Sequence, residues 1–214
     1  MCAMKIILGS QSPQRFQLLN TVVDNLTALP PLCSDEPGFT GLHTIAEIEH
    51  RLQQVVDLKF ADVAGQVVAM DPSTDDCCIL CADTVVVATG SDGQPIVLGK
   101  PPENGWRDVV RDWFTTYYAD TNHQVWTCVK ISAGQNRYQE IVKTELKLRD
   151  IDSAMLEWYL STGEPVGKAG GYGVQGVAAM FVESMQGSLT NVVGLPMFEV
   201  TTALSQLKVV SLQN

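Results

Sequence analysis

The stretch Cys77-Cys78-Ile79-Leu80-Cys81-Ala82-Asp83-Thr84-Val85-Val86-Val87-Ala88 is a near-continuous apolar run that is rich in valine. A short run of this kind is typical of a strand that is buried on both faces of a sheet. Gly90-Ser91-Asp92-Gly93 then predicts a turn into a second strand over Pro95 to Leu98. The run therefore predicts a central strand around which the other elements pack.

Helix signals lie on both sides of this strand in the sequence. Ser12 and Pro13 predict a helix start, with serine as the N-cap and proline in the first turn, and the helix is expected to run to about Asn20. Thr44 to Glu47 has the pattern of a capping box. Apolar residues follow it at helical spacing, namely Ile45, Ile48, Leu52, Val55, Val56 and Val63.

The remaining pattern mixes helices with strands and hairpins. In chain order we expect a strand over Lys5 to Leu8, an irregular segment 21–43, a helix from Glu103 to about Tyr118, a hairpin of Gln124–Ser132 and Tyr138–Leu148, a short helix capped by Asp152, a strand over Ala179–Glu183 and a last helix opening at Pro196. This mixture predicts an α/β fold with a mixed sheet. No linker divides the 214 residues, so we expect residues 1–214 to form a single domain with two lobes.

Composition excludes several classes of protein. The formal net charge is −10, with too few Lys and Arg for the broad positive surface of a nucleic-acid binder. No apolar stretch approaches the roughly 20 residues that a membrane span needs. The N-terminal residues lack a secretory pattern, so we expect a cytoplasmic protein with reduced thiols. An anionic ligand would have to be bound by a few well-placed cations.

Six cysteines, at positions 2, 33, 77, 78, 81 and 128, show no framework spacing. Cys78 to Cys81 matches C-x-x-C, but the match lies inside the apolar run and has no second pair. A zinc or redox site built on Cys77, Cys78 and Cys81 stays open beside the simpler interpretation as buried small hydrophobes.

Two charged residues interrupt apolar patterns. Asp83 lies within the valine-rich run, and a buried carboxylate needs a partner, a cation or a cleft. It is either a structural aspartate bonded to backbone amides or a catalytic or metal-binding residue. Lys59 lies on the apolar stripe of the helix that follows Thr44, where a lysine either extends to the rim or points into a cleft.

Two further segments have the composition of ligand-binding loops. Ser10 to Arg15 joins a strand to a helix start, where free amides favour an anion such as phosphate. Lys100 adds a cation just after a strand, although a plain surface lysine is the alternative. Gly171 to Gly176 matches G-x-G-x-x-G, but no strand leads into it, so we reject a dinucleotide site there.

Taken in order, these pieces resemble the Maf family of nucleoside triphosphate pyrophosphatases. The resemblance extends over nearly the whole chain and rests on seven blocks: Leu8–Arg15, Ser34–Glu36, Cys81–Val87, Leu98–Pro101, Thr162–Pro165, Lys168–Gly176 and Asn191–Pro196. It implies an elongated α/β fold of two lobes around a cleft, similar to the inosine triphosphatase group. The implied reaction is hydrolysis of a nucleoside triphosphate to the monophosphate and pyrophosphate with Mg²⁺ or Mn²⁺. A homodimer is also compatible with the family.

The resemblance also assigns roles to residues. Asp83 matches the family's proton acceptor, and Glu36 with Asp83 would hold the metal. Gln14, Thr84 and Gln175 match positions associated with substrate choice, and Thr84 with Gln175 resembles the subfamily that acts on dTTP and UTP. The other matching polar residues would surround the triphosphate and metal, namely Ser10, Ser12, Arg15, Lys59, Lys100 and Lys168.

One departure concerns the substrate. The family pattern is S-x-S-P-R-R, and Gln14 stands where the first arginine is expected. Glutamine supplies neither a charge nor a guanidinium fork, so the phosphate affinity or the base preference is expected to differ. An alternative function is a nucleotide-sensing regulator of septum formation that binds without turnover.

Overall fold

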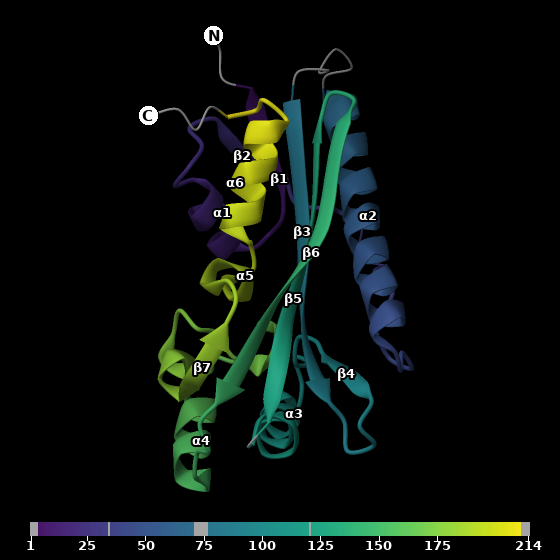
Figure 1. The fold of residues 1–214 in the computed structure, drawn as a ribbon. Coiled ribbons are helices and arrows are strands. Elements are labelled where there is room, and N and C mark those ends of the chain that lie inside the picture. The colour runs from purple at the N-terminus through teal and green to yellow at the C-terminus, as the bar shows by residue number, and fades with distance from the viewer. Residues whose placement is uncertain (1–3, 34, 71–76, 120, 211–214) are drawn as a thin grey trace.

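A computed structural model describes residues 4–33, 35–70, 77–119 and 121–210 (Figure 1). Cys2 and Ser34, which were named above, lie outside these ranges. Within the described ranges, none of the helices combines the length and the hydropathy that crossing a bilayer requires.

The helices and strands alternate along the chain. They are β1 (Lys5–Gly9), α1 (Pro13–Leu19), β2 (Leu26–Ala28), α2 (Ile45–Met70), β3 (Cys77–Thr89), β4 (Pro95–Leu98), α3 (Trp106–Trp113), the π-helical turn η1 (Phe114–Tyr118), β5 (Asn122–Ala133), β6 (Asn136–Leu148), α4 (Ser153–Ser161), the 3-10 turns η2 (Ala169–Gly171) and η3 (Val177–Phe181), β7 (Val182–Gln186), α5 (Leu189–Val193) and α6 (Met197–Gln206).

The strands form one mixed sheet, as predicted. Its order is β2-β1-β3-β5-β6-β7, and β4 also pairs with β3. β1 is parallel to β2 and β3, whereas the other pairs are antiparallel. Figure 1 shows an elongated molecule in which β3, β5 and β6 run from one lobe into the other, with α2 on one side of the sheet and α1 and α6 on the other. The expected α/β fold of two lobes is confirmed.

β3 contributes to three hydrophobic clusters, which explains its apolar sequence. Cys78, Leu80 and Ala82 face a cluster that includes α1 and α6, whereas the alternate residues of β3 face the cluster under α2. Val86 and Ala88 belong to a third cluster in the other lobe. Because side chains alternate along a strand, burial on both faces requires an apolar residue at nearly every position.

The predicted caps form as expected. The Ser12 hydroxyl accepts a hydrogen bond from the Arg15 amide at 3.3 Å, and Pro13 is the first residue of α1. In the capping box before α2, the Thr44 amide donates to Glu47 Oε2 at 3.0 Å and the Glu47 amide donates to the Thr44 hydroxyl at 3.2 Å. The Asp152 carboxylate accepts from the Met155 amide at 2.7 Å.

Some of the expected elements were wrong. Segment 21–43 contains the short strand β2, whose three residues are too few to show the alternation of apolar and polar side chains that indicates a strand. The helix α5 was not predicted either. The strand expected over Ala179–Glu183 starts only at Val182, because Val177 to Phe181 form η3. The Glu164 carboxylate accepts hydrogen bonds from the Val177 and Ala178 amides, and this contact from 13 residues away supports η3. The helix expected from Glu103 begins at Trp106, after Gly105 in the left-handed conformation.

One edge of β3 is uncovered in the middle of the strand. β1 pairs with β3 only as far as Cys81, and β4 pairs with β3 only from Val86 onward. Along its other edge, β3 pairs with β5 from Cys78 to Val87. In the part of the chain that the structure describes, residues 82–85 therefore have no partner strand on the β1 and β4 side. We call this segment the open edge of β3.

Candidate active site

A cleft lies along the open edge of β3. Its cavity volume is about 890 Å³, and its walls come from the β1–α1 loop, α2, β3, the loop after β4, the glycine-rich segment 167–176 and the end of α5. The structure brings all eleven residues that the sequence singled out to this cleft: Ser10, Ser12, Gln14, Arg15, Glu36, Lys59, Asp83, Thr84, Lys100, Lys168 and Gln175. Residues separated by more than 150 positions in the chain thus share one cavity.

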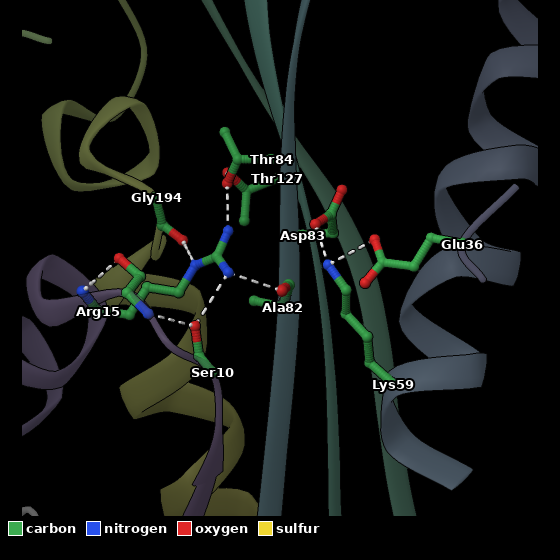
Figure 2. A network of polar contacts seen from close by, with 10 residues as sticks. Ser10, Arg15, Glu36, Lys59, Ala82, Asp83, Thr84, Thr127 and Gly194 are labelled. Carbon is green, nitrogen blue, oxygen red and sulfur yellow. Dashed lines mark hydrogen bonds and ion pairs between the residues drawn. The ribbon is translucent and has the colours of Figure 1, made fainter. Parts of the chain in front are cut away.

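Asp83 and Thr84 are neighbours in sequence but serve opposite faces of the sheet. Figure 2 shows Asp83 pointing toward Lys59 and Glu36, and Thr84 pointing toward Arg15. This division follows from the alternation of side chains along a strand. Both side chains still line the same cavity, because the open edge leaves the space beside residues 82–85 for the cleft.

A cationic side chain joins two carboxylates on the α2 side. Lys59 Nζ forms an ion pair with Asp83 Oδ1 and lies 3.2 Å from Glu36 Oε2 (Figure 2). The side chains of Lys59 and Asp83 are 13% and 18% exposed, and that of Glu36 is 37% exposed. Lys59 lies on the buried face of α2, between Val56 and Val63. Its ammonium therefore ends in the cleft and not at the outer rim.

The same two carboxylates form a donor set that suits a hard cation. Glu36 and Asp83 come from separate segments and converge on one positive charge, which is here the ammonium of Lys59. Mg²⁺ and Mn²⁺ prefer carboxylate oxygens and commonly keep several waters, so two protein ligands are sufficient. These residues fit such an ion.

Arg15 lies on the opposite side of β3 and makes four hydrogen bonds. Its Nε donates to the Gly194 carbonyl at 2.8 Å, and its Nη1 donates to the Ser10 hydroxyl at 3.2 Å and the Ala82 carbonyl at 2.8 Å. Its Nη2 donates to the Thr84 hydroxyl at 2.9 Å. Burial lowers the pKa of the guanidinium, and the nearby charge of Asp83 acts in the opposite direction.

The glycine-rich segment forms the far wall of the cleft. Lys168 is half-buried and its ammonium donates to the Glu164 carbonyl, whereas Gln175 and Lys100 are exposed. A Cβ on Gly173 would lie 2.8 Å from Lys168 Cδ, and a Cβ on Gly176 would overlap the Glu164 carboxylate. These two glycines thus leave room for side chains that shape the wall.

A cluster of aromatic residues supports this wall from behind. The Tyr118 hydroxyl donates to the Gly170 carbonyl at 2.7 Å, and the Tyr159 hydroxyl donates to the Gly171 carbonyl at 3.0 Å. His123 Nε2 lies 2.7 Å from the Tyr172 hydroxyl, and burial lowers the pKa of His123 to about 4. The π-helical turn η1 places Tyr118 in this cluster.

The sequence did not indicate which residues support the walls of the cleft. Glu164 stood in a quoted block, but its contact with the amides of η3 depends on the tertiary fold. Thr127 lies in a strand that alternates normally, and nothing in the sequence indicates that its hydroxyl is 2.9 Å from that of Thr84. The one feature that distinguishes Thr127 is that it is a polar residue at a fully buried position. The burial of a residue cannot be read from a single sequence.

The C-x-x-C match does not form a site. Cys78 and Cys81 belong to clusters on opposite faces of the sheet, because residues three apart in a strand point in opposite directions. Burial raises the pKa of both thiols to about 12. Deep burial and a raised pKa are typical of unreactive structural cysteines.

Comparisons with known proteins agree with the motifs. A family model described as Maf-like protein matches residues 5–207. A protein of Cereibacter sphaeroides named dTTP/UTP pyrophosphatase is 34% identical over 203 residues, which cover 94% of this chain and 94% of the relative. One of the same name from Bradyrhizobium diazoefficiens is 33% identical, with 94% and 90% covered. A protein of Haemophilus ducreyi named nucleoside triphosphate pyrophosphatase is 30% identical, with 96% of each chain covered.

Proposed function

The chain belongs to the Maf-like protein family, and from this premise we propose that it is a nucleoside triphosphate pyrophosphatase. We infer that it hydrolyses dTTP, UTP or a related nucleotide to the monophosphate and pyrophosphate. The relatives named above carry this activity in their names. The observation that carries the proposal is the convergence of Glu36, Lys59 and Asp83 in a cleft that two further lysines line.

The reaction needs a base and a source of positive charge. In our proposal Asp83 accepts a proton from a water molecule as its oxygen attacks the α-phosphorus. A bond forms between this oxygen and phosphorus, the bridging bond to the β-phosphate breaks, and pyrophosphate leaves with the electron pair. The ion pair between Lys59 and Asp83 Oδ1 fixes the carboxylate, and we assign Oδ2 to the water.

The other charged residues are assigned by position. Glu36 and Asp83 would hold Mg²⁺ or Mn²⁺, which when bound supplies positive charge to the phosphate oxygens. Lys100 and Lys168 line the same cavity from other segments and are assigned to the triphosphate. A protein with a net charge of −10 can bind a polyanion in this way, because a few cations are concentrated in one cleft.

The specificity residues are assigned to the nucleoside. We place Gln14, Thr84 and Gln175 near the base, and Ser10 and Ser12 near the phosphates. The Ser12 hydroxyl donates to Gln14 Oε1 at 3.1 Å, which leaves the amide nitrogen of Gln14 as a donor for the ligand.

The test is a nucleotide panel assayed for pyrophosphate and orthophosphate separately, with Mg²⁺ and with Mn²⁺. We expect pyrophosphate from dTTP or UTP, and a loss of about 10²- to 10⁴-fold in kcat for Asp83→Asn, the usual size of a general-base effect. Wild-type turnover in a homogeneous Asp83→Asn preparation would remove the base assignment. Tight binding of dTTP without pyrophosphate release from any nucleotide would favour the nucleotide-sensing regulator.

A further inference from the structure

Arg15, on α1, is hydrogen-bonded to three other segments of the chain. Its acceptors are the Ser10 hydroxyl after β1, the Ala82 carbonyl and Thr84 hydroxyl of β3, and the Gly194 carbonyl between α5 and α6 (Figure 2). A guanidinium has five N–H groups. Within the described residues, four of these five groups already have an acceptor in the protein.

The position of Arg15 corresponds to the open edge of β3. The Ala82 carbonyl belongs to a residue that has no partner strand on this side, and Arg15 Nη1 donates to it at 2.8 Å. A buried carbonyl without a donor is costly, so a side chain must supply the bond that β1 and β4 do not reach. Arg15 does this and at the same time holds the turn at Gly194 against the strand.

The directions of the hydrogen bonds around Thr84 are fixed by valence. Arg15 can only donate, so Thr84 Oγ1 accepts from Nη2. The Thr127 hydroxyl donates to the Asn191 carbonyl at 3.1 Å, which uses its single hydrogen. In the 2.9 Å contact between the two threonines, Thr84 must therefore be the donor. Thr84 keeps only one lone pair for the cleft, and an ionised phosphate has no hydrogen to give it.

From these contacts we propose that Arg15 is a positioning residue and not a ligand of the triphosphate. It braces the open edge of β3, orients the Thr84 hydroxyl as an acceptor for the nucleoside, and anchors the Gly194 turn. Lys100 and Lys168, which approach from other segments, then supply the cationic contacts to phosphate. This inference rests on the proposed nucleotide substrate. It adds that the face of β3 with Arg15 and Thr84 serves the nucleoside, whereas the face with Asp83 serves the reaction.

The test compares the affinity for a triphosphate with that for a monophosphate. Calorimetry with α,β-methylene-UTP and with UMP gives the ratio of the two affinities for wild type, Arg15→Lys and Arg15→Met, and thermal unfolding gives Tm for each. Lysine keeps the charge but cannot bridge four acceptors. We expect both variants to lower Tm and to leave the affinity ratio within about 3-fold of wild type.

A matched control is Lys100→Met, which removes a cation assigned to phosphate. It should lower the affinity ratio by about 10- to 100-fold, the usual value of a charge-assisted hydrogen bond, with little change in Tm. A comparable fall of the ratio in Arg15→Met that Arg15→Lys restores would overturn the proposal. If neither Arg15 variant folds, Thr84→Val is measured with the same two readouts; it removes the acceptor of Nη2, the donor to Thr127 and the hydroxyl assigned to the nucleoside. We expect a lower Tm and an affinity ratio within about 3-fold of wild type, because a nucleoside contact affects both ligands alike, and a fall of the ratio by about 10-fold or more would overturn the proposal.

The outcome can be separated from that of the proposed function. Absence of pyrophosphate release by the wild type would count against the pyrophosphatase assignment. The affinity ratio does not depend on turnover, so it still decides whether Arg15 contacts phosphate.

Discussion

At the scale of single residues, neighbouring side chains determine which ion pairs and hydrogen bonds each residue of the cleft can make. Lys59 would be an ordinary surface lysine if α2 were rotated by one position, yet here it ends between two carboxylates. Gln14 shows the same dependence, because its amide oxygen accepts from the Ser12 hydroxyl and its nitrogen is left as a donor. The chemical role of each residue is therefore a property of its contacts.

Replacing Gln14 with arginine should move the chain toward the family pattern. Gln14→Arg adds a cation and a planar set of donors at the start of α1, so we expect a lower KM for nucleoside triphosphates or a changed order of preference among bases. Steady-state kinetics on the nucleotide panel measure both. Unchanged kinetics for every nucleotide would mean that residue 14 does not contact the substrate.

His123 should make stability depend on pH. Its pKa is lowered to about 4 by burial, whereas the unfolded value is about 6.5, so the unfolded state binds more protons between these values. Stability should fall as pH decreases from about 6.5 to about 4, by about 3 kcal/mol from this residue alone. Urea unfolding of wild type and His123→Gln at several pH values isolates the effect. Parallel pH curves for the two proteins would contradict it.

At the scale of elements, the sequence predicted well wherever a local pattern determines the structure. β3, the cap of α1 and the capping box of α2 were predicted because burial on both faces and N-terminal hydrogen bonds have direct residue signatures. η3 and β2 were not, because they depend on distant segments, namely the contact of Glu164 with the amides of Val177 and Ala178 and the pairing of β2 with β1. α5 has a local cap at Ser188, but its five residues are too few to show a helical apolar pattern.

The candidate site follows the same division. The positions of Asp83 and Lys59 attracted attention because charges interrupted apolar patterns, but no sequence pattern indicated that the two would form an ion pair. The roles assigned to the eleven cleft residues came from the family resemblance and stay predictions. The acceptors of Arg15 could not be predicted, because two of them are backbone carbonyls that every residue carries.

The glycine-rich segment offers a prediction about one wall of the cleft. In Gly173→Ala the new Cβ would displace the flexible stem of Lys168 without requiring a left-handed backbone. We expect a change in stability below about 1 kcal/mol, since a flexible side chain can move, but a KM for UTP that is raised several-fold. Kinetics and urea unfolding measure the two effects. Gly38→Ala, outside the helices and at a position where a Cβ has no neighbour within 4 Å, serves as the control for alanine itself.

At the scale of the whole molecule, the two lobes share their longest strands. β3, β5 and β6 run through both lobes, and β3 supplies side chains to all three hydrophobic clusters. Separate unfolding of one lobe would remove half of a strand from its ladder. The single domain expected from the sequence stays a prediction that solution measurements can examine, and so does the homodimer.

We expect the chain to unfold in one cooperative transition. Trp126 reports on the cluster under α2, and Trp113 packs against the cluster of the other lobe. Chains that retain one of these tryptophans, with the others changed to phenylalanine, can be unfolded in urea and followed by fluorescence and circular dichroism. The two probes should give the same midpoint within each chain. Midpoints that differ between probes in either chain would mean that the lobes are separate folding units.

The open edge of β3 also has a consequence for the behaviour of the protein at high concentration. Unpaired strand edges are templates on which other chains can add a strand, so an open edge needs protection when the protein is concentrated. Here the guanidinium of Arg15 occupies the Ala82 carbonyl, and the cleft surrounds the rest of the edge. The open edge is thus protected by the charge of Asp83 and by the same side chain that organises the cleft, so losing Arg15 would free the Ala82 carbonyl as a site for self-association.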